Sequence, residues 1–213
     1  KIDAIIHLAA QINARTSLDK PLLDAKTNIL GSLNLLELAR KCNIKKFIYA
    51  SSAAVYGEPK YLPCDELHPI KPINNYGISK CTVEKYLYLY NKLYGLDYII
   101  LRYSNVYGPR QDHNGEAGVI SIFINNLLNN EPIIIFGDGS LTREFVFVED
   151  VVKATILALI RKTMAKIFNI GTNKETSINQ LLETLKMIFN TDVKNVYANA
   201  KPGEVKRMIL DSS

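Results

Sequence analysis

Apolar runs of strand length alternate along this chain with longer stretches of helical character. The expected elements of the first half are strands at 2–9, 47–51 and 98–103 and helices at 22–40 and 76–94. Asp19 and Pro21 indicate the start of the first helix, since a polar cap followed by proline favours a helix N-terminus. The strand runs are almost continuously apolar, as in strands covered on both faces. The pattern therefore predicts an α/β fold with a doubly wound parallel sheet.

The second half continues this alternation after a polar interruption. Residues 108–121 are rich in glycine and polar side chains and are expected to form a loop that leaves the sheet. Glu149 and Asp150 are expected to cap a helix, and Ser177 with Gln180 forms a capping box that starts another. The remaining expected elements are helices near 123–129 and at 151–162 and strands at 133–136, 145–148 and 167–170.

Length and composition narrow the class of protein. The 213 residues, 47% of them hydrophobic and 22% charged, suffice for one domain or a domain with an additional lobe. No apolar run approaches the roughly 18 residues of a membrane span, and no signal-peptide pattern is present. We therefore expect a cytoplasmic protein without a membrane partner.

Charge and cysteine content argue against a nucleic-acid-binding protein and against a metalloprotein. The net charge of +5 arises from cations interspersed with acids, so we expect no nucleic-acid partner and instead a field that attracts an anionic small molecule. Three cysteines cannot all pair, and they show neither CxxC nor His/Cys metal spacing. We expect reduced thiols and no metal site.

A hydroxyl at a strand end and a Tyr/Lys pair on a helix form the candidate catalytic group. Ser52 directly follows the second expected strand, and Tyr76 and Lys80 lie four residues apart on one face of the following helix. The lysine charge favours the tyrosinate, so Tyr76 could serve as a general base. The spacing alone is weak, because Tyr56/Lys60 and Tyr88/Lys92 repeat it. Gly57 and Pro59 interrupt the first of these, and the second is expected to be a packed tyrosine beside a solvated lysine.

These residues, with motifs along nearly the whole chain, resemble the extended short-chain dehydrogenase/reductase family, and among them nucleotide-sugar epimerases of the UDP-glucose 4-epimerase type. The motifs that carry the resemblance are Ile6-His7-Leu8-Ala9-Ala10, Thr27-Asn28-Ile29-Leu30-Gly31, the Ser52/Tyr76/Lys80 set, the segments 102–109, 135–139 and 143–150, and Pro202-Gly203-Glu204. The resemblance implies a Rossmann-like fold with a smaller, discontinuous α/β substrate lobe.

The resemblance also predicts how the chain is divided. We expect a Rossmann-like NAD-binding domain at 1–107, a first part of the substrate lobe at 108–144, a return to the Rossmann-like domain at 145–173 and a second lobe part at 174–213. No glycine-rich pyrophosphate turn occurs in the sequence, and the last residues match the beginning of a longer family segment. We therefore expect an internal piece of a larger reading frame, and expect residues 1–213 alone to be poorly soluble and not to retain NAD.

The reaction that the resemblance implies is an NAD-dependent inversion at C4 of a UDP-hexose through a transient 4-keto sugar. Tyr76 would exchange the C4 hydroxyl proton, Ser52 would hydrogen-bond that oxygen, and Lys80 would bind the nicotinamide ribose. Related 4,6-dehydratases need an adjacent Asp and Glu after the serine, whereas Ala53 and Ala54 stand here. Because alanine cannot exchange a proton, simple epimerisation is favoured over elimination.

The resemblance further implies the residues that bind the cofactor and the substrate. The expected NAD contacts are Ala9, Ala10, Asn28, Ser51, Tyr76, Lys80 and Tyr103. The expected UDP-sugar contacts are Ser52, Asn105, Val119, Phe136, Arg143, Lys201, Glu204 and Met208. Lys201 and Glu204 replace the more usual Arg and Asp of the family, and lysine lacks the bidentate geometry of arginine. The residue that selects NAD over NADP follows a strand that this sequence does not contain.

Several alternatives stay open at this point. Asn105 could cap a turn, Arg143 could form a surface ion pair with Glu144 or Glu149, and Phe136 could belong to the core. The substrate could be a UDP-linked N-acetylhexosamine or uronic acid, and the chain could be a non-catalytic NAD-binding scaffold. We expect a homodimer, as in the family that the chain resembles.

Overall fold

The computed structural model describes residues 2–113, 118–200 and 205–213. At its centre lies a four-stranded parallel sheet with the strand order β1-β2-β3-β7. Its members are β1 (Ala4–His7), β2 (Lys46–Ser52), β3 (Asp97–Tyr103) and β7 (Ile167–Ile170). The register pairs Ser52 at the end of β2 with Tyr103 at the end of β3, so both strands end at the same edge of the sheet.

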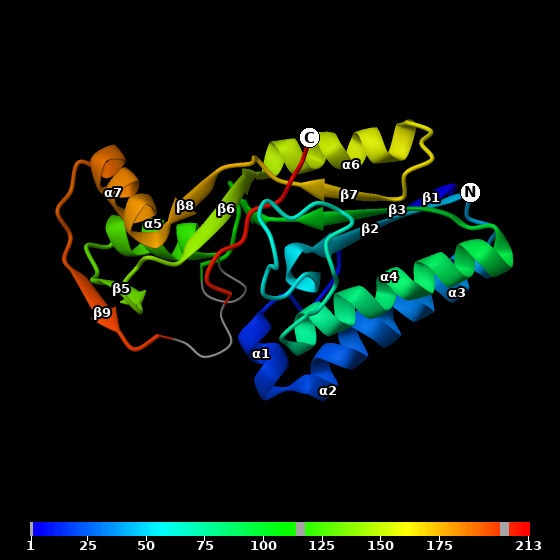
Figure 1. The fold of residues 1–213 in the computed structure, drawn as a ribbon, viewed down its shortest axis with the longest axis horizontal. Coiled ribbons are helices and arrows are strands. Elements are labelled where there is room, and N and C mark those ends of the chain that lie inside the picture. Colours follow the sequence, from blue (N-terminus) through cyan, green and yellow to red (C-terminus); the bar gives the residue numbers. More distant parts are fainter. Residues whose placement is uncertain (1, 114–117, 201–204) are drawn as a thin grey trace.

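Helices cover both faces of this sheet (Figure 1). On one face, α3 (Gly31–Lys41) and α4 (Asn75–Tyr94) pack on Phe47 and Tyr49 of β2; on the other, α6 (Val148–Ile160) lies over Ile48. Side chains alternate between the faces of a strand, so both sets of positions must be apolar when both faces are covered. The structure thus confirms the Rossmann-like doubly wound α/β fold.

The first helical region is more divided than the sequence indicates. It consists of α1 (Ala14–Asp19), α2 (Pro21–Asp24), the π-helix η1 (Ala25–Leu30) and then α3. Asn13 caps α1 by accepting a hydrogen bond from the Thr16 amide at 2.9 Å. The prediction of Asp19 as the helix start is wrong, because Asp19 ends α1 and Lys20 is the N-cap of α2; Pro21 does occupy the first turn.

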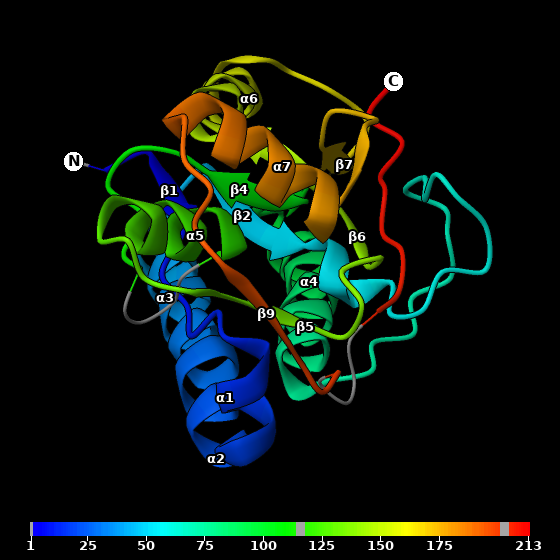
Figure 2. The ribbon, with the colours of Figure 1, turned by 90° about the vertical axis from the view of Figure 1, so that its left-hand side faces the viewer.

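A smaller group of elements packs beside the carboxyl ends of the central strands (Figures 1 and 2). One sheet has the order β4-β6-β8, and β5 pairs in parallel with β9. Helices α5 and α7 cover these strands with an apolar core that includes Phe123, Ile133 and Leu182. The elements are β4 (Asn105–Tyr107), α5 (Val119–Leu128), β5 (Ile133–Phe136), β6 (Thr142–Phe147), β8 (Glu175–Ser177), α7 (Ile178–Phe189) and β9 (Asn195–Ala198).

Local predictions in this region had mixed outcomes. The capping box of Ser177 and Gln180 is confirmed at the start of α7. The prediction that Glu149 and Asp150 cap α6 is wrong: α6 begins at Val148, and both acids lie in its first turn, where they complement the helix dipole. The expected domain boundaries stay predictions. Strand β6 runs across the expected boundary between residues 144 and 145. In the part of the chain that the structure describes, no helix is both long and apolar enough to cross a membrane.

Candidate active site

A pocket of about 300 Å³ lies beyond the carboxyl ends of β2 and β3. Six residues that the sequence predicts to bind or transform a ligand meet in it. They are Ser52, Tyr76, Tyr103, Asn105, Arg143 and Met208. The structure thus brings side chains from the central sheet, from α4, from the β4-β6-β8 sheet and from the C-terminal segment to the crevice where open α/β sheets bind ligands.

Close packing between two backbone segments sets Tyr76 beside Ser52. Asn74 caps α4 by accepting from the Gly77 amide at 2.8 Å, which fixes Tyr76 in the first turn. A Cβ on Gly77 would lie 2.5 Å from the carbonyl oxygen of Ala54, so only glycine permits this approach. Ser52 in turn caps the 3₁₀ helix η2 (Ala53–Val55), its Oγ accepting from the Ala54 amide at 3.1 Å.

Lys80 lies one turn below Tyr76 and is only 3% exposed. Its Nζ donates a 2.7 Å hydrogen bond to the carbonyl oxygen of Ala50 and stands 5.7 Å from the centre of the Tyr76 ring. Burial lowers the pKa of Lys80 to about 8, against the charges of Asp24 and Glu84, which raise it. A buried cation is therefore held next to the phenol, as a Tyr/Lys proton-transfer pair requires.

A buried ion pair fixes α4 to the sheet beneath the pocket. Arg102 donates to both carboxylate oxygens of Glu84, from Nε at 3.0 Å and from Nη2 at 2.7 Å. The Ser51 hydroxyl donates to the same carboxylate at 2.6 Å, and Arg102 also donates to the Tyr56 hydroxyl at 3.0 Å. Ser51, predicted to contact NAD, thus has its side chain in this network on the α4 side of β2. Removing one partner would leave a buried charge uncompensated.

The other two Tyr-x-x-x-Lys pairs have different surroundings. Tyr56 is buried, and burial raises the pKa of its phenol to about 12, although the Arg102 charge opposes this. Tyr88 is 55% exposed and lies under the Lys92 ammonium, 5.6 Å from Nζ to the ring centre, so the expectation of a packed tyrosine there is wrong. Neither pair lines the pocket formed by Ser52 and Tyr76.

Asn28 anchors the segment that follows β1. Its amide nitrogen donates to the Gln11 carbonyl at 2.9 Å, to Asp24 Oδ1 at 3.0 Å and to Ser79 Oγ at 3.1 Å, while its oxygen accepts from the Gln11 amide at 2.8 Å. Asn28 therefore holds the loop after β1 against α4. Ala9 is exposed and Ala10 half-buried at the start of this loop, where the resemblance predicts contact with NAD.

The opposite side of the pocket carries the predicted nucleotide contacts. Arg143 donates from Nη1 to the carbonyl oxygens of Thr142 and Val205, both at 2.7 Å. Asn105 donates to the Glu144 carbonyl at 3.0 Å and is exposed. The Glu144 carboxylate itself accepts backbone N–H bonds, including that of Leu210 at 2.9 Å. Arg143 is thus directed by two carbonyls at the rim of the pocket.

Some predicted contacts do not line this pocket, and sequence reasoning missed some residues that do. Val119 packs against the core of the smaller group of elements, and the pocket lining does not include Val119 or Phe136. Lys201 and Glu204 lie outside the described residues. The lining residues that sequence reasoning did not name are Ile12, Ala14, Ile73, Asn74, Ser104 and Val205. Only Asn74, as a helix cap before Asn75, carried a local signal.

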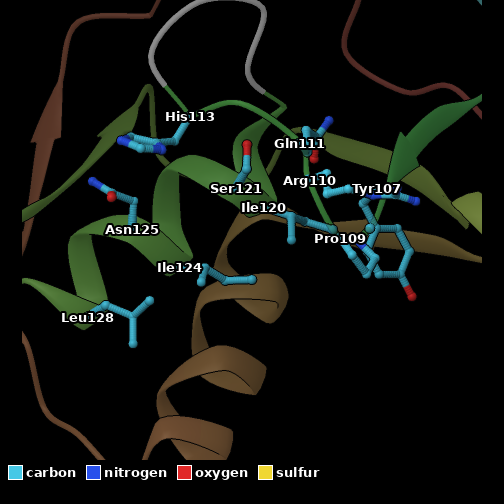
Figure 3. Close-up of a pocket in the computed structure, with 11 residues that line it drawn as sticks. Tyr107, Pro109, Arg110, Gln111, His113, Ile120, Ser121, Ile124, Asn125 and Leu128 are labelled. Carbon is cyan, nitrogen blue, oxygen red and sulfur yellow. The ribbon is translucent and has the colours of Figure 1, made fainter.

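A second, open pocket of about 330 Å³ lies beside α5 (Figure 3). The loop after β4 and one face of α5 line it, and Ile120 extends towards Pro109. His113 and Asn125 lie at its polar side. None of Ser52, Tyr76 or Lys80 lines this pocket, whereas Ser52 and Tyr76 both line the first one.

Comparison with known families and proteins agrees with this site. Residues 1–171 match the NAD dependent epimerase/dehydratase family, and the chain belongs to that family. It is 54% identical over 211 residues to a putative UDP-glucose 4-epimerase of Methanocaldococcus jannaschii, covering 99% of this chain and 68% of the relative. A UDP-glucose 4-epimerase of Mycolicibacterium smegmatis is 40% identical over 214 residues, which cover 100% of this chain and 68% of that relative.

Solved structures show the same fold with related substrates. The UDP-glucose 4-epimerase of Thermotoga maritima with UDP-glucose has a TM-score of 0.96 and 46% identity, over 99% of this chain and 69% of that one. A UDP-N-acetylglucosamine 4-epimerase of Methanobrevibacter ruminantium, in complex with UDP-N-acetylmuramic acid, has a TM-score of 0.95 and 38% identity, over 99% and 68%. The Thermus thermophilus UDP-glucose 4-epimerase complex with NAD has a TM-score of 0.94 and 36% identity, over 99% and 70%.

The residues at the strand ends fit the nicotinamide and ribose half of NAD, the cofactor of this family. Lys80 has three N–H donors, one of which goes to Ala50, and ammonium donors suit ribose hydroxyls. Ala9 and Ala10 place only small side chains beyond β1. We propose that Lys80 would hold the nicotinamide ribose of a bound NAD, and that Ala9 and Ala10 would leave room for its ribose and phosphates.

Proposed function

We propose that this protein interconverts UDP-glucose and UDP-galactose by inverting C4 of the hexose. The observation that carries the proposal is the meeting of Ser52 and Tyr76 in one pocket, with the Lys80 ammonium 5.7 Å from the Tyr76 ring centre. Ala53 and Ala54 line the same pocket and offer no acid or base for elimination of water. Proton exchange at one carbinol is the chemistry that these side chains can perform.

The roles follow from the contacts. Tyr76 accepts the proton of the C4 hydroxyl and later returns it, which needs only hydrogen-bond reach. Ser52, held by its bond with the Ala54 amide, donates its hydroxyl proton to the C4 oxygen. Lys80 favours the tyrosinate through its charge. NAD, when bound, would supply the hydride acceptor and donor for C4 of the sugar.

The charges of the pocket favour a neutral hexose. Arg143 is the only Lys, Arg or His among the described residues that line it. If Arg143 pairs with the diphosphate, to which its planar fork is suited, no other cation among the described lining residues remains for the carboxylate of a uronic acid. The walls near Ser52 are instead apolar, with Ile12, Ala53 and Met208. An N-acetylated hexose is the second candidate, supported by the similarity to a UDP-N-acetylglucosamine 4-epimerase.

We also propose a homodimer formed through α3 and α4. These helices lie side by side and expose large apolar side chains, among them Leu38, Leu89, Leu93 and Tyr94. Exposed apolar surface on neighbouring helices is typical of an interface. Leu93→Asp should therefore lower the mass found by sedimentation, whereas Leu67→Asp, at an exposed loop position, should not. A monomeric unmodified protein at micromolar concentration would contradict this arrangement.

The decisive test is conversion of UDP-galactose to UDP-glucose by the protein in the presence of added NAD. The expected result is an equilibrium mixture of the two sugars with no net reduction of NAD, because hydride is returned in each cycle. A protein that binds NAD and UDP but leaves both sugars unchanged would instead favour the non-catalytic scaffold. Comparing UDP-galactose, UDP-N-acetylgalactosamine and UDP-galacturonate in the same assay ranks the three substrate classes.

A further inference from the structure

Ser104 lines the catalytic pocket and carries a buried hydroxyl group. Ser104 lies between β3 and β4 and shares the pocket with Ser52 and Tyr76. The Ser104 Oγ is buried and has no hydrogen-bond partner among the described residues. Its backbone amide donates to the Ile170 carbonyl at 3.0 Å, so the residue is held in place by β7.

The strand register places Ser104 next to the end of β2, which carries Ser52. Ser52 is paired with Tyr103, and Ser104 is the next residue along the chain at the same sheet edge. Neighbouring strands lie roughly 4.8 Å apart, so Ser104 is close to the turn formed by Ser52 and Ala53. Ala53 and Ile12, which also line this pocket, have no polar side-chain atom to offer Ser104.

A buried hydroxyl without a partner lowers the stability of a protein, and this cost is removed when a ligand supplies the missing bond. We propose that the Ser104 hydroxyl binds substrate, by a hydrogen bond to a hydroxyl group of the neutral hexose; this inference rests on the proposed UDP-hexose epimerase function. A serine hydroxyl both donates and accepts, which matches a sugar hydroxyl in either role. Ser104 is thus a specificity residue beside the proton-transfer group.

Ser104→Ala separates this role from a purely structural one. Removing an unpartnered buried hydroxyl should leave the thermal midpoint of the sugar-free protein unchanged or slightly higher. The KM for UDP-galactose should rise roughly 3- to 10-fold, the range of a neutral hydrogen bond, while the Kd for UDP stays the same. A residue with a purely structural role would instead lower the thermal midpoint when it is replaced.

Ser212→Ala is the matched control. The Ser212 Oγ is also buried without a partner among the described residues, but Ser212 does not line the pocket. It should change the thermal midpoint as little as Ser104→Ala does and leave the KM unchanged. A thermal midpoint that falls in Ser104→Ala but not in Ser212→Ala would overturn the proposal, because the hydroxyl would then serve the fold.

Sugar binding can be measured independently of turnover. The protein is titrated with UDP and with UDP-galactose in the presence of NAD. The Kd for UDP divided by the Kd for UDP-galactose then gives the contribution of the hexose to binding. Ser104→Ala should reduce this ratio roughly 3- to 10-fold. An unchanged ratio would overturn the role of Ser104 even in an active enzyme. A protein that binds the hexose through Ser104 but does not epimerise it would refute the proposed function alone.

Discussion

The Lys80 ammonium donates a 2.7 Å hydrogen bond to the carbonyl oxygen of Ala50. This bond ties the helix that carries Tyr76 to the strand that carries Ser52, two residues beyond Ala50. Because both partners belong to regular elements, the distance between phenol and hydroxyl is set by the packing of α4 on β2. Functional groups on such elements are held more accurately than groups on loops.

The Lys80 environment predicts how turnover depends on pH. Burial lowers the pKa of Lys80 to about 8 from the ordinary value of 10.5, so turnover should decline as the pH rises through about 8. Between these two values the unfolded chain binds more protons than the folded one, so this group makes the free energy of unfolding rise with pH. Measurement of kcat and of urea denaturation at the same pH values checks both signs. If activity and stability fell together near pH 8, loss of fold rather than of the Lys80 charge would be responsible.

Tyr76→Phe should lower kcat by about 10²- to 10⁴-fold, since it removes the proton-transfer group. The Kd for UDP should remain nearly unchanged, because the ring is retained. Tyr88→Phe is the matched control, since Tyr88 belongs to a second Tyr-x-x-x-Lys pair on the same helix but is exposed outside the pocket. Turnover of Tyr76→Phe at the rate of Tyr88→Phe would exclude Tyr76 as the base.

The central fold could be predicted because its signals are local and repeated. Phe47, Ile48 and Tyr49 are all buried, on alternate faces of β2, as one continuous apolar run predicts, and each helix that covers the strand has its own apolar face. The short strands β4, β8 and β9 were missed because three or four residues carry little periodicity. Their pairing depends on partners distant in sequence, such as β6 for β4.

The site could be predicted where a reactive side chain stands at the end of a predictable strand or helix, as Ser52 and Tyr76 do. The sequence could not show which side chains also have structural partners. The Ser51 hydroxyl is taken by Glu84, which is 33 residues away, and the Asn28 amide by Gln11 and Ser79. Ser104 was missed because an unpartnered hydroxyl can be recognised only after its surroundings are known.

Arg143→Ala should weaken UDP binding roughly 10- to 100-fold, the range of a charge-assisted hydrogen bond. The remaining affinity should also depend less on salt, because a charge pair with the diphosphate is lost. Arg143→Lys should restore little, since lysine lacks the planar fork. Arg207→Ala serves as the control, because Arg207 is exposed and paired with Glu175 at 2.7 Å. Equal UDP affinity of both alanine variants would show that Arg143 does not bind phosphate.

His7 should make the fold sensitive to mild acid. Burial, with a smaller contribution from the Lys80 charge, lowers the pKa of His7 to about 4 from 6.5. Between these values the unfolded chain binds the additional proton, so the free energy of unfolding should fall as the pH falls from 6.5 towards 4. His7→Gln removes this proton uptake and should flatten the profile, whereas His113→Gln, at an exposed position, should not. An identical slope in all three proteins would assign the acid sensitivity to other groups.

Met208 should control the space beside the sugar. It is 6% exposed, lines the pocket and packs in the same apolar cluster as Ala53 and Leu210. Methionine is flexible and of intermediate size, so we expect the unmodified enzyme to act on UDP-galactose with some activity on UDP-N-acetylgalactosamine.

Met208→Ser should enlarge this space and raise kcat/KM for the N-acetylated sugar relative to the unsubstituted one. The same change removes buried apolar volume, and large-to-small substitutions in a core commonly cost about 2–5 kcal/mol. The ratio of the two kcat/KM values, measured on one preparation, is independent of the fraction of folded enzyme. Met187→Ser, at an exposed position of α7, should leave this ratio unchanged. An unchanged ratio in Met208→Ser as well would mean that the acetamido group is accommodated elsewhere in the pocket.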